Sequence, residues 1–135
     1  MDFLSFNEGR SLLAESGLPA TCHFLLSTKD CDTHAVADTL AGGVGEITGT
    51  GYARTSEALP GPSSADPTVI AFDPQTWATG ANTDWPASVK SVVMVSTADN
   101  SGKAICAWNL VPGGAARAFN AADTTENFTP TLDLS

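Results

Sequence analysis

The densest group of side chains that could do chemistry is Cys31-Asp32-Thr33-His34, followed four residues later by Asp38. Thiolate, imidazole and carboxylate groups are ligands that zinc accepts in proteins. No second pair of such residues follows at a spacing that completes a tetrahedral site. A small metal-binding domain built on these residues is therefore kept only as an alternative to a protein without metal.

Histidine is too scarce in this chain to favour acid–base catalysis. The two histidines are His23, inside a predicted strand, and His34. A serine nucleophile needs a histidine base that an acidic residue positions. The sequence contains no G-x-S-x-G, H-E-x-x-H, P-loop or EF-hand pattern, and the glycine-rich run at 42–45 is not followed by Lys-Ser or Lys-Thr. We therefore expect no enzymatic activity, no catalytic residues and no cofactor.

The three cysteines, Cys22, Cys31 and Cys106, are widely separated and form no C-x-x-C pair. An odd number of cysteines argues against the fully paired framework of a small secreted domain. Cys22 and Cys106 lie in apolar, strand-like runs, which is typical of buried free thiols. A disulfide between Cys22 and Cys31, closing a short loop, stays open as an alternative. Synthesis in a reducing cytoplasm fits this cysteine usage.

The charge of the chain limits its partners. The formal net charge is −9, and the six basic residues are scattered along the sequence. Binding to nucleic acid or to an anionic membrane needs a clustered basic surface, so we expect neither partner. Charged residues make up 16% of the chain, against about 25% in typical soluble domains. Such a surface suits packing against another protein.

The periodicity of the chain predicts a mainly β fold in a single domain. We expect a short helix over Asn7–Gly17, with Asn7 as its N-cap, because Gly17 and Leu18-Pro19 end it. About seven strands at the spacing of a sandwich or barrel follow. They are expected at 20–28, 46–55, 68–72 with a continuation at 76–78, 89–97, 103–111 and 126–134, with a hairpin turn at 98–102 and a helical turn near 33–40. The predicted architecture is one antiparallel β-sandwich, jelly-roll or immunoglobulin-like, over 20–135, preceded by an N-terminal arm and short helix over 1–19.

The stretch Gly49-Thr50-Gly51-Tyr52-Ala53-Arg54 is expected to lie in the second strand. Glycine inside a strand often marks a bulge or a close approach of other atoms to the backbone. Tyr52 and Arg54, two residues apart, would then share one face.

Four aromatic or apolar residues are candidates for binding a partner. Phe3, Leu4 and Phe6 lie in the N-terminal arm, which either docks on a neighbouring subunit or caps its own domain. Trp85 precedes a proline in a polar loop, so it is the best candidate for an exposed aromatic, although it can also hold its own loop in place.

Several short motifs together resemble the small β-domain structural proteins of tailed bacteriophages. The resemblance covers about residues 20–135, and Ala122 departs from the glycine usual before its Asp-Thr step. The matching motifs are the polar loop at 33–38, Gly49–Arg54, the strand pair at 92–95 and 105–110, Asp123-Thr124, and the closing Phe128-Thr129-Pro130-Thr131-Leu132.

The resemblance implies a virion protein without enzymatic activity. We expect a capsid decoration or minor capsid protein that binds the major capsid protein, forms a homo-oligomer and resides in particles assembled in the host cytoplasm. The alternative that the resemblance leaves open is a tail or fibre protein that recognises a host surface, with Trp77 and Trp85 as platforms for sugars.

Overall fold

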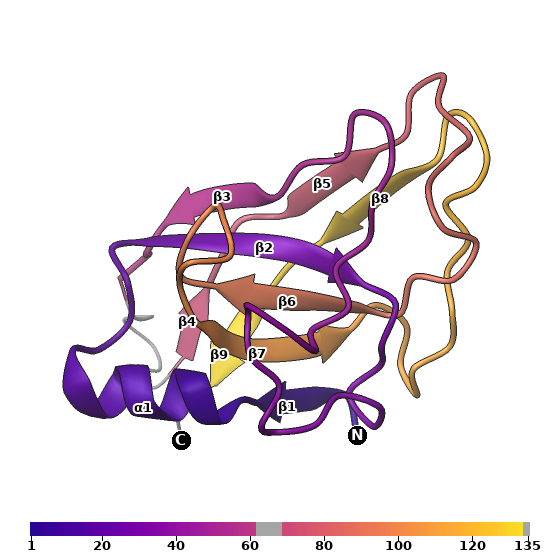
Figure 1. Cartoon of the computed structure of the whole chain (residues 1–135). Coiled ribbons are helices and arrows are strands. Elements are labelled where there is room, and N and C mark those ends of the chain that lie inside the picture. Colours follow the sequence, from indigo (N-terminus) through magenta and orange to yellow (C-terminus); the bar gives the residue numbers. More distant parts are fainter. Residues whose placement is uncertain (62–68, 134–135) are drawn as a thin grey trace.

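Two layers of antiparallel strands with one short helix make up the fold, as seen in a computed structural model that describes residues 1–61 and 69–133 (Figure 1). The mainly β prediction and the short N-terminal helix are confirmed. In chain order the elements are β1 (Phe3–Ser5), α1 (Asn7–Glu15), β2 (Thr21–Ser27), β3 (Thr55–Ala58), β4 (Val69–Ala71), β5 (Gln75–Ala78), β6 (Ser91–Val95), β7 (Ala104–Asn109), β8 (Thr125–Phe128) and β9 (Thr131–Asp133).

The main sheet has five strands in the order β1-β7-β6-β2-β3, all neighbours being antiparallel. The predicted hairpin between 89–97 and 103–111 forms its centre as β6 and β7. Every residue of β6 and β7 is buried, because both faces of the sheet are covered. Val92 and Met94 point into the core between the layers, whereas Val93 and Val95 point to the other face. Continuous β-branched residues suit a strand that is buried on both sides.

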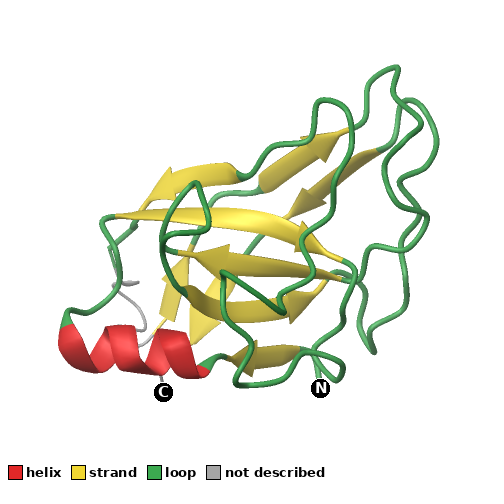
Figure 2. Cartoon of the chain, viewed as in Figure 1, coloured by secondary structure: helices red, strands yellow, loops and turns green. Residues whose placement is uncertain are grey.

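We call the core between the two layers the inner core, and the apolar cluster on the other side of the main sheet the outer core. The inner core contains Phe24 of β2 and Phe72, whose ring centroids lie 5.1 Å apart. In the outer core, Cys31, Leu40 and Val44 pack against the sheet. These three residues belong to a long connection, residues 29–45, that we call the outer loop; it crosses in front of the sheet in Figure 2.

The second layer is made of two strand pairs, β4 with β9 and β5 with β8. The predicted closing strand at 126–134 is interrupted at Pro130, and Pro74 interrupts the opposite side between β4 and β5. Proline has no amide hydrogen to donate to a ladder, so it breaks a strand. The amide of Phe72 donates to the carbonyl of Pro130 (3.0 Å), which keeps the two pairs joined.

The predicted N-terminal arm folds onto its own domain. β1 is the edge strand beside β7, and Leu4 and Phe6 are buried in the outer core. α1 begins at Asn7 with Phe6 at the cap position, so the prediction of Asn7 as N-cap is wrong. The amide of Asn7 donates instead to the carbonyl of Val36 (2.8 Å). α1 approaches β7 so closely that a Cβ atom on Gly9 would lie 2.4 Å from the Ile105 carbonyl oxygen.

The predicted strand over 46–55 is wrong for most of its length. Glu46 forms an isolated bridge with Ser27, and the regular strand starts at Thr55. Between them the chain turns, because the amide of Tyr52 donates to the carbonyl of Gly49 (3.1 Å) and Gly51 has a φ of 78°. A left-handed conformation of this kind favours glycine.

Candidate functional site

One polar cluster of the described residues joins Glu46, Tyr52 and Arg54. The guanidinium of Arg54 holds both oxygens of Glu46, with Nη2 to Oε1 at 2.7 Å and Nε to Oε2 at 2.9 Å. The hydroxyl of Tyr52 donates to Glu46 Oε2 (2.9 Å) and accepts from the amide of Leu26 (3.1 Å). Tyr52 and Arg54 thus bind the same carboxylate, although Tyr52 ends a turn and neither residue lies in a strand.

Arg54 also binds the turn of the central hairpin. Its Nη1 donates to the carbonyls of Thr97 (3.2 Å) and Asp99 (2.6 Å), and its Nη2 donates to Asn100 Oδ1 (2.5 Å). Hydrogen bonds from a charged donor are stronger than those between neutral groups. The carboxylate of Glu46 raises the pKa of Arg54 further. The side chain is only 7% exposed, so Arg54 acts as an internal connector between two loops.

A brace from the neighbouring loop fixes the turn that carries Tyr52. The indole of Trp85 donates to the carbonyl of Thr50 (2.8 Å), and Asp84 accepts from the amide of Thr50 (3.0 Å) and from its hydroxyl (2.7 Å). A Cβ atom on Gly49 would lie 2.5 Å from Trp85 Cδ1, so the predicted close approach at this glycine is confirmed. Trp85 is not an exposed aromatic, because only 3% of the residue is accessible, and its bond to Thr50 fits the alternative that it holds a loop in place.

A polar depression of about 540 Å³ lies over this cluster and includes Glu46, Thr48, Arg54 and Asn100 in its wall. Burial raises the pKa of Tyr52 well above its usual value, so the hydroxyl stays protonated at any physiological pH. Both oxygens of Glu46 and all three nitrogens of the Arg54 guanidinium already have partners within the chain. Because these oxygens and nitrogens already have hydrogen-bond partners within the chain, the cluster serves to hold two loops together.

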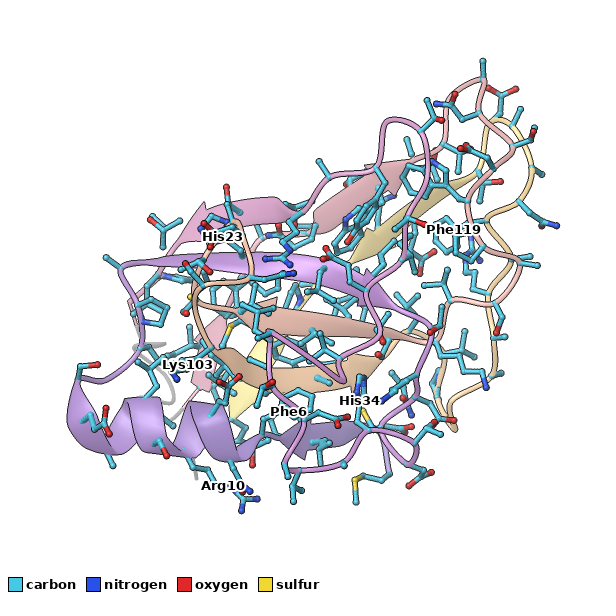
Figure 3. The ribbon with its side chains drawn as sticks, in the orientation of Figure 1. Phe6, Arg10, His23, His34, Lys103 and Phe119 are labelled. Atoms are coloured by element: carbon cyan, nitrogen blue, oxygen red, sulfur yellow. The ribbon has the colours of Figure 1, made fainter. Side chains whose placement is uncertain are left out.

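A second polar cluster, formed by His34, Ser91 and Asp38, has the composition of a hydrolase triad. His34 Nε2 lies 3.1 Å from Ser91 Oγ, and His34 Nδ1 lies 3.8 Å from Asp38 Oδ2. Figure 3 shows His34 beside Phe6, and their rings meet edge to face at 5.3 Å. Ser91 is fully buried and donates its hydrogen to the carbonyl of Lys29 (2.5 Å). A substrate cannot reach this hydroxyl, so the cluster is unsuited to nucleophilic catalysis.

The residues of the alternative metal site, Cys31, Asp32, His34 and Asp38, do not converge on one point. Cys31 Sγ donates to the carbonyl of Ala107 (3.5 Å), and Asp32 lies at the surface near the Met1 ammonium group (3.6 Å). The ammonium group of Lys29 already sits 3.3 Å from Asp38. Within residues 1–61 and 69–133, no three His, Cys, Asp or Glu side chains are grouped so that they could hold a metal ion. The segment 33–40 forms turns and no helix.

The three cysteines are buried free thiols. Cys22 and Cys106 lie in the inner core and Cys31 in the outer core, so the main sheet separates Cys22 from Cys31. The open alternative of a disulfide between these two is therefore wrong for this fold. Burial raises the pKa of Cys22 and of Cys31 to about 11. Such thiols are almost entirely protonated at neutral pH, which makes them poor nucleophiles.

Of the residues predicted to bind a partner, Phe3 is the one that reaches the surface. Phe3 is 38% exposed, whereas Leu4, Phe6 and Trp85 contribute to the chain's own cores. Sequence reasoning missed Leu13 of α1, which is 44% exposed and lies across a groove from Phe3. A small apolar groove of about 180 Å³ lies between these side chains, with Leu18, Ile105, Cys106 and Leu132 in its wall.

Comparison of the chain with models of protein families, with curated proteins and with solved structures returned no match. In the part of the chain that the structure describes, no helix combines the length and the apolar character needed to cross a membrane.

Proposed function

We propose that this protein is a non-enzymatic structural component of a bacteriophage virion, a decoration or minor capsid protein that binds the major capsid protein. Besides the apolar groove between Phe3 and Leu13, two features support this proposal. The first is the resemblance of the sequence motifs to small β-domain virion proteins. The second is the use of the reactive side chains within the chain itself: the Arg54 guanidinium, the His34 ring and the three thiols all serve internal packing or hydrogen bonding.

The observation that carries the proposal is the apolar groove beside Phe3 and Leu13. Both side chains are more than a third exposed, although each is large and apolar. Exposed apolar surface beside a groove is typical of contacts with another protein. The groove lies between α1, β1 and β9, so a capsid surface bound there would meet the side of the sandwich.

Binding of the protein to empty phage heads tests the proposal directly. Purified full-length protein is mixed with empty heads of the phage that carries this gene, and the pellet after sedimentation is quantified over a range of protein concentrations. We expect binding that saturates at a fixed ratio to the major capsid protein. An unrelated acidic protein of similar size controls for trapping. Binding no greater than this control at any concentration would overturn the proposal.

A matched pair of variants tests the groove. Leu13→Asp places a charge in the groove, while Val36→Asp changes an equally exposed apolar residue outside it (44% and 41% exposed). We expect at least a tenfold loss of head binding for Leu13→Asp alone. An equal loss in both variants, or in neither, would place the attachment surface elsewhere.

The tail or fibre alternative loses its predicted sugar platform in this fold. Trp77 and Trp85 are each 3% exposed and belong to the inner core. The sedimentation experiment, repeated with purified tails, separates the two locations in the virion.

A further inference from the structure

His34 is buried in a position where its protonation state can be deduced from its partners. Ser91 has one hydroxyl hydrogen, and it is donated to the carbonyl of Lys29 (2.5 Å). At its contact with His34 Nε2 (3.1 Å), the Ser91 oxygen must therefore act as the acceptor. Nε2 carries the hydrogen in the neutral ring, and Nδ1 is left with a bare lone pair.

The bare nitrogen faces a carboxylate and has no hydrogen-bond partner. Nδ1 is buried and unpaired, and Asp38 Oδ2 lies 3.8 Å away, beyond hydrogen-bonding distance. Asp38 is already held by the ammonium group of Lys29 (3.3 Å) and by the amide of Ala35 (2.9 Å). A proton added to Nδ1 would place a full charge on a side chain that has no access to water.

This ring ties the outer loop to the main sheet. His34 and Lys29 belong to the outer loop, and both contact Ser91 of β6. Further along the loop, the carbonyl of Val44 accepts from the hydroxyl of Ser27 (2.6 Å), and the amide of Leu40 donates to Glu8 Oε1 (2.8 Å). If His34 leaves Ser91, the loop loses one of its attachments to the main sheet, beside those that Lys29 makes to Ser91 and Cys31 makes to Asn109.

We propose that His34 is an acid-sensitive latch: protonation places a charge on a ring that water cannot reach, so acid favours an open state in which the outer loop has left Ser91 and the outer face of the main sheet is uncovered. The inference does not depend on the proposed role in a virion. The groups that face the ring are Asp38, Lys29 and Asp30 from the outer loop, the hydroxyl of Ser91 from β6, and the ring of Phe6 from the segment before α1. The uncovered face would present Leu4, Leu25, Val93, Val95 and Ala107.

The balance of these groups decides the direction of the effect. Desolvation is the largest influence and lowers the pKa of His34 below 6.5, although Asp38 and Asp30 act in the opposite sense and Lys29 adds to the lowering. The closed state therefore binds fewer protons than the open state when the pH falls below 6.5. The ratio of closed to open molecules drops by up to about tenfold per pH unit between 6.5 and the pKa of the closed state.

Hydrogen exchange of the full-length protein measures this release. Amide exchange, corrected for its intrinsic pH dependence, is followed from about pH 7.5 to about pH 5, where histidine alone among the ordinary side chains changes charge. We expect the amides of Cys31 and Leu40, which bond to Asn109 and Glu8, to lose protection with acid, while that of Met94 in β6 keeps it.

Two substitutions make the test specific to one histidine. His34→Gln keeps a donor toward Ser91 without a titratable group, so the acid-induced loss of protection should disappear. His23→Gln removes the other histidine, on β2, and should leave the loss unchanged. The same acid response in wild type and His34→Gln would overturn the proposal.

A measurement on the unaltered protein covers the case in which His34→Gln does not fold. The NMR titration of the His34 ring gives its pKa directly and reports whether Nε2 carries the hydrogen in the neutral form. A pKa below 6.5 with an Nε2-protonated ring is the expected result. A pKa at or above 6.5, or a ring protonated at Nδ1, would refute the latch.

Discussion

Two polar clusters attach loops to the same sheet in different ways. In the Glu46–Tyr52–Arg54 cluster, permanent charges meet and each charged group has several partners. In the His34–Ser91–Asp38 cluster, a neutral ring makes one hydrogen bond and leaves Nδ1 unpaired. The first arrangement should hold its loop across the physiological pH range. The second should hold its loop less firmly once the ring is protonated.

Loss of the Arg54 guanidinium should have the largest effect. Arg54→Met leaves the Glu46 carboxylate and the carbonyls of the hairpin turn without their donor. Removing one partner of a largely buried ion pair costs roughly 3 kcal/mol or more. Urea unfolding should show this loss equally at about pH 5.5 and about pH 7.5. The double variant Glu46→Gln/Arg54→Met should recover part of it; no recovery would mean that the turn carbonyls carry the energy.

A methyl group at Gly49 should have the next largest effect. In Gly49→Ala the new Cβ atom meets Trp85, and overpacking of this kind costs about 1–3 kcal/mol. Gly61→Ala is the matched control, because no atom of residues 1–61 and 69–133 beyond its chain neighbours lies within 4 Å of its new Cβ position. Thermal unfolding should separate the two variants. If they melt alike, the brace between Trp85 and the turn is looser than the structure indicates.

Removing one hydroxyl from each cluster compares them directly. Tyr52→Phe leaves the Leu26 amide without its acceptor, and Ser91→Ala takes away the acceptor of His34 Nε2. Each change should cost about 1–2 kcal/mol of unfolding free energy. The cost of Tyr52→Phe should be constant between about pH 5 and about pH 8, while that of Ser91→Ala should vary with pH. A pH-independent cost in both would remove the distinction between the clusters.

The smallest effect is expected at Asp84. Hydrogen bonds from Thr50 hold the pKa of this carboxyl below 3.8. A carboxyl whose pKa is lower in the folded state than in the unfolded chain stabilises the fold at any pH above its pKa in the unfolded chain. The contribution of Asp84 should therefore fade only as the pH drops below 3.8. Asp84→Asn should therefore flatten the acid limb of the stability curve below that pH and leave the range near neutrality unchanged. A change near pH 6 would link Asp84 to the His34 cluster.

Local patterns allowed parts of both the fold and the candidate site to be predicted. The central hairpin was predictable because its apolar β-branched strands flank a polar turn. The close approach at Gly49 was one of two alternatives, a bulge being the other, that the glycines of an expected strand suggested, and it occurs although that strand does not form. Tyr52 and Arg54 were expected to share one face of a strand; no strand forms there, and it is Glu46 that brings the two side chains together.

Contacts between distant residues could not be predicted. Trp85 stands before a proline in a polar loop, which is typical of the surface, but its partner Thr50 lies 35 residues earlier. Ser91 and His34 are 57 residues apart, and only the crossing of the outer loop over β6 brings them together. The expected strand over 46–55 failed because Gly51 and the brace from Trp85 favour a turn there.

The separation of the thiols by the main sheet provides chemical reporters for the two halves of the molecule. Cys31 belongs to the outer loop and packs in the outer core, and Cys22 and Cys106 lie between the layers. A thiol reagent can modify each cysteine only after the structure around it opens. The order in which mass spectrometry detects the three adducts would therefore record which side of the sheet opens first, without any label being introduced. Mild acid should accelerate the modification of Cys31 ahead of the other two.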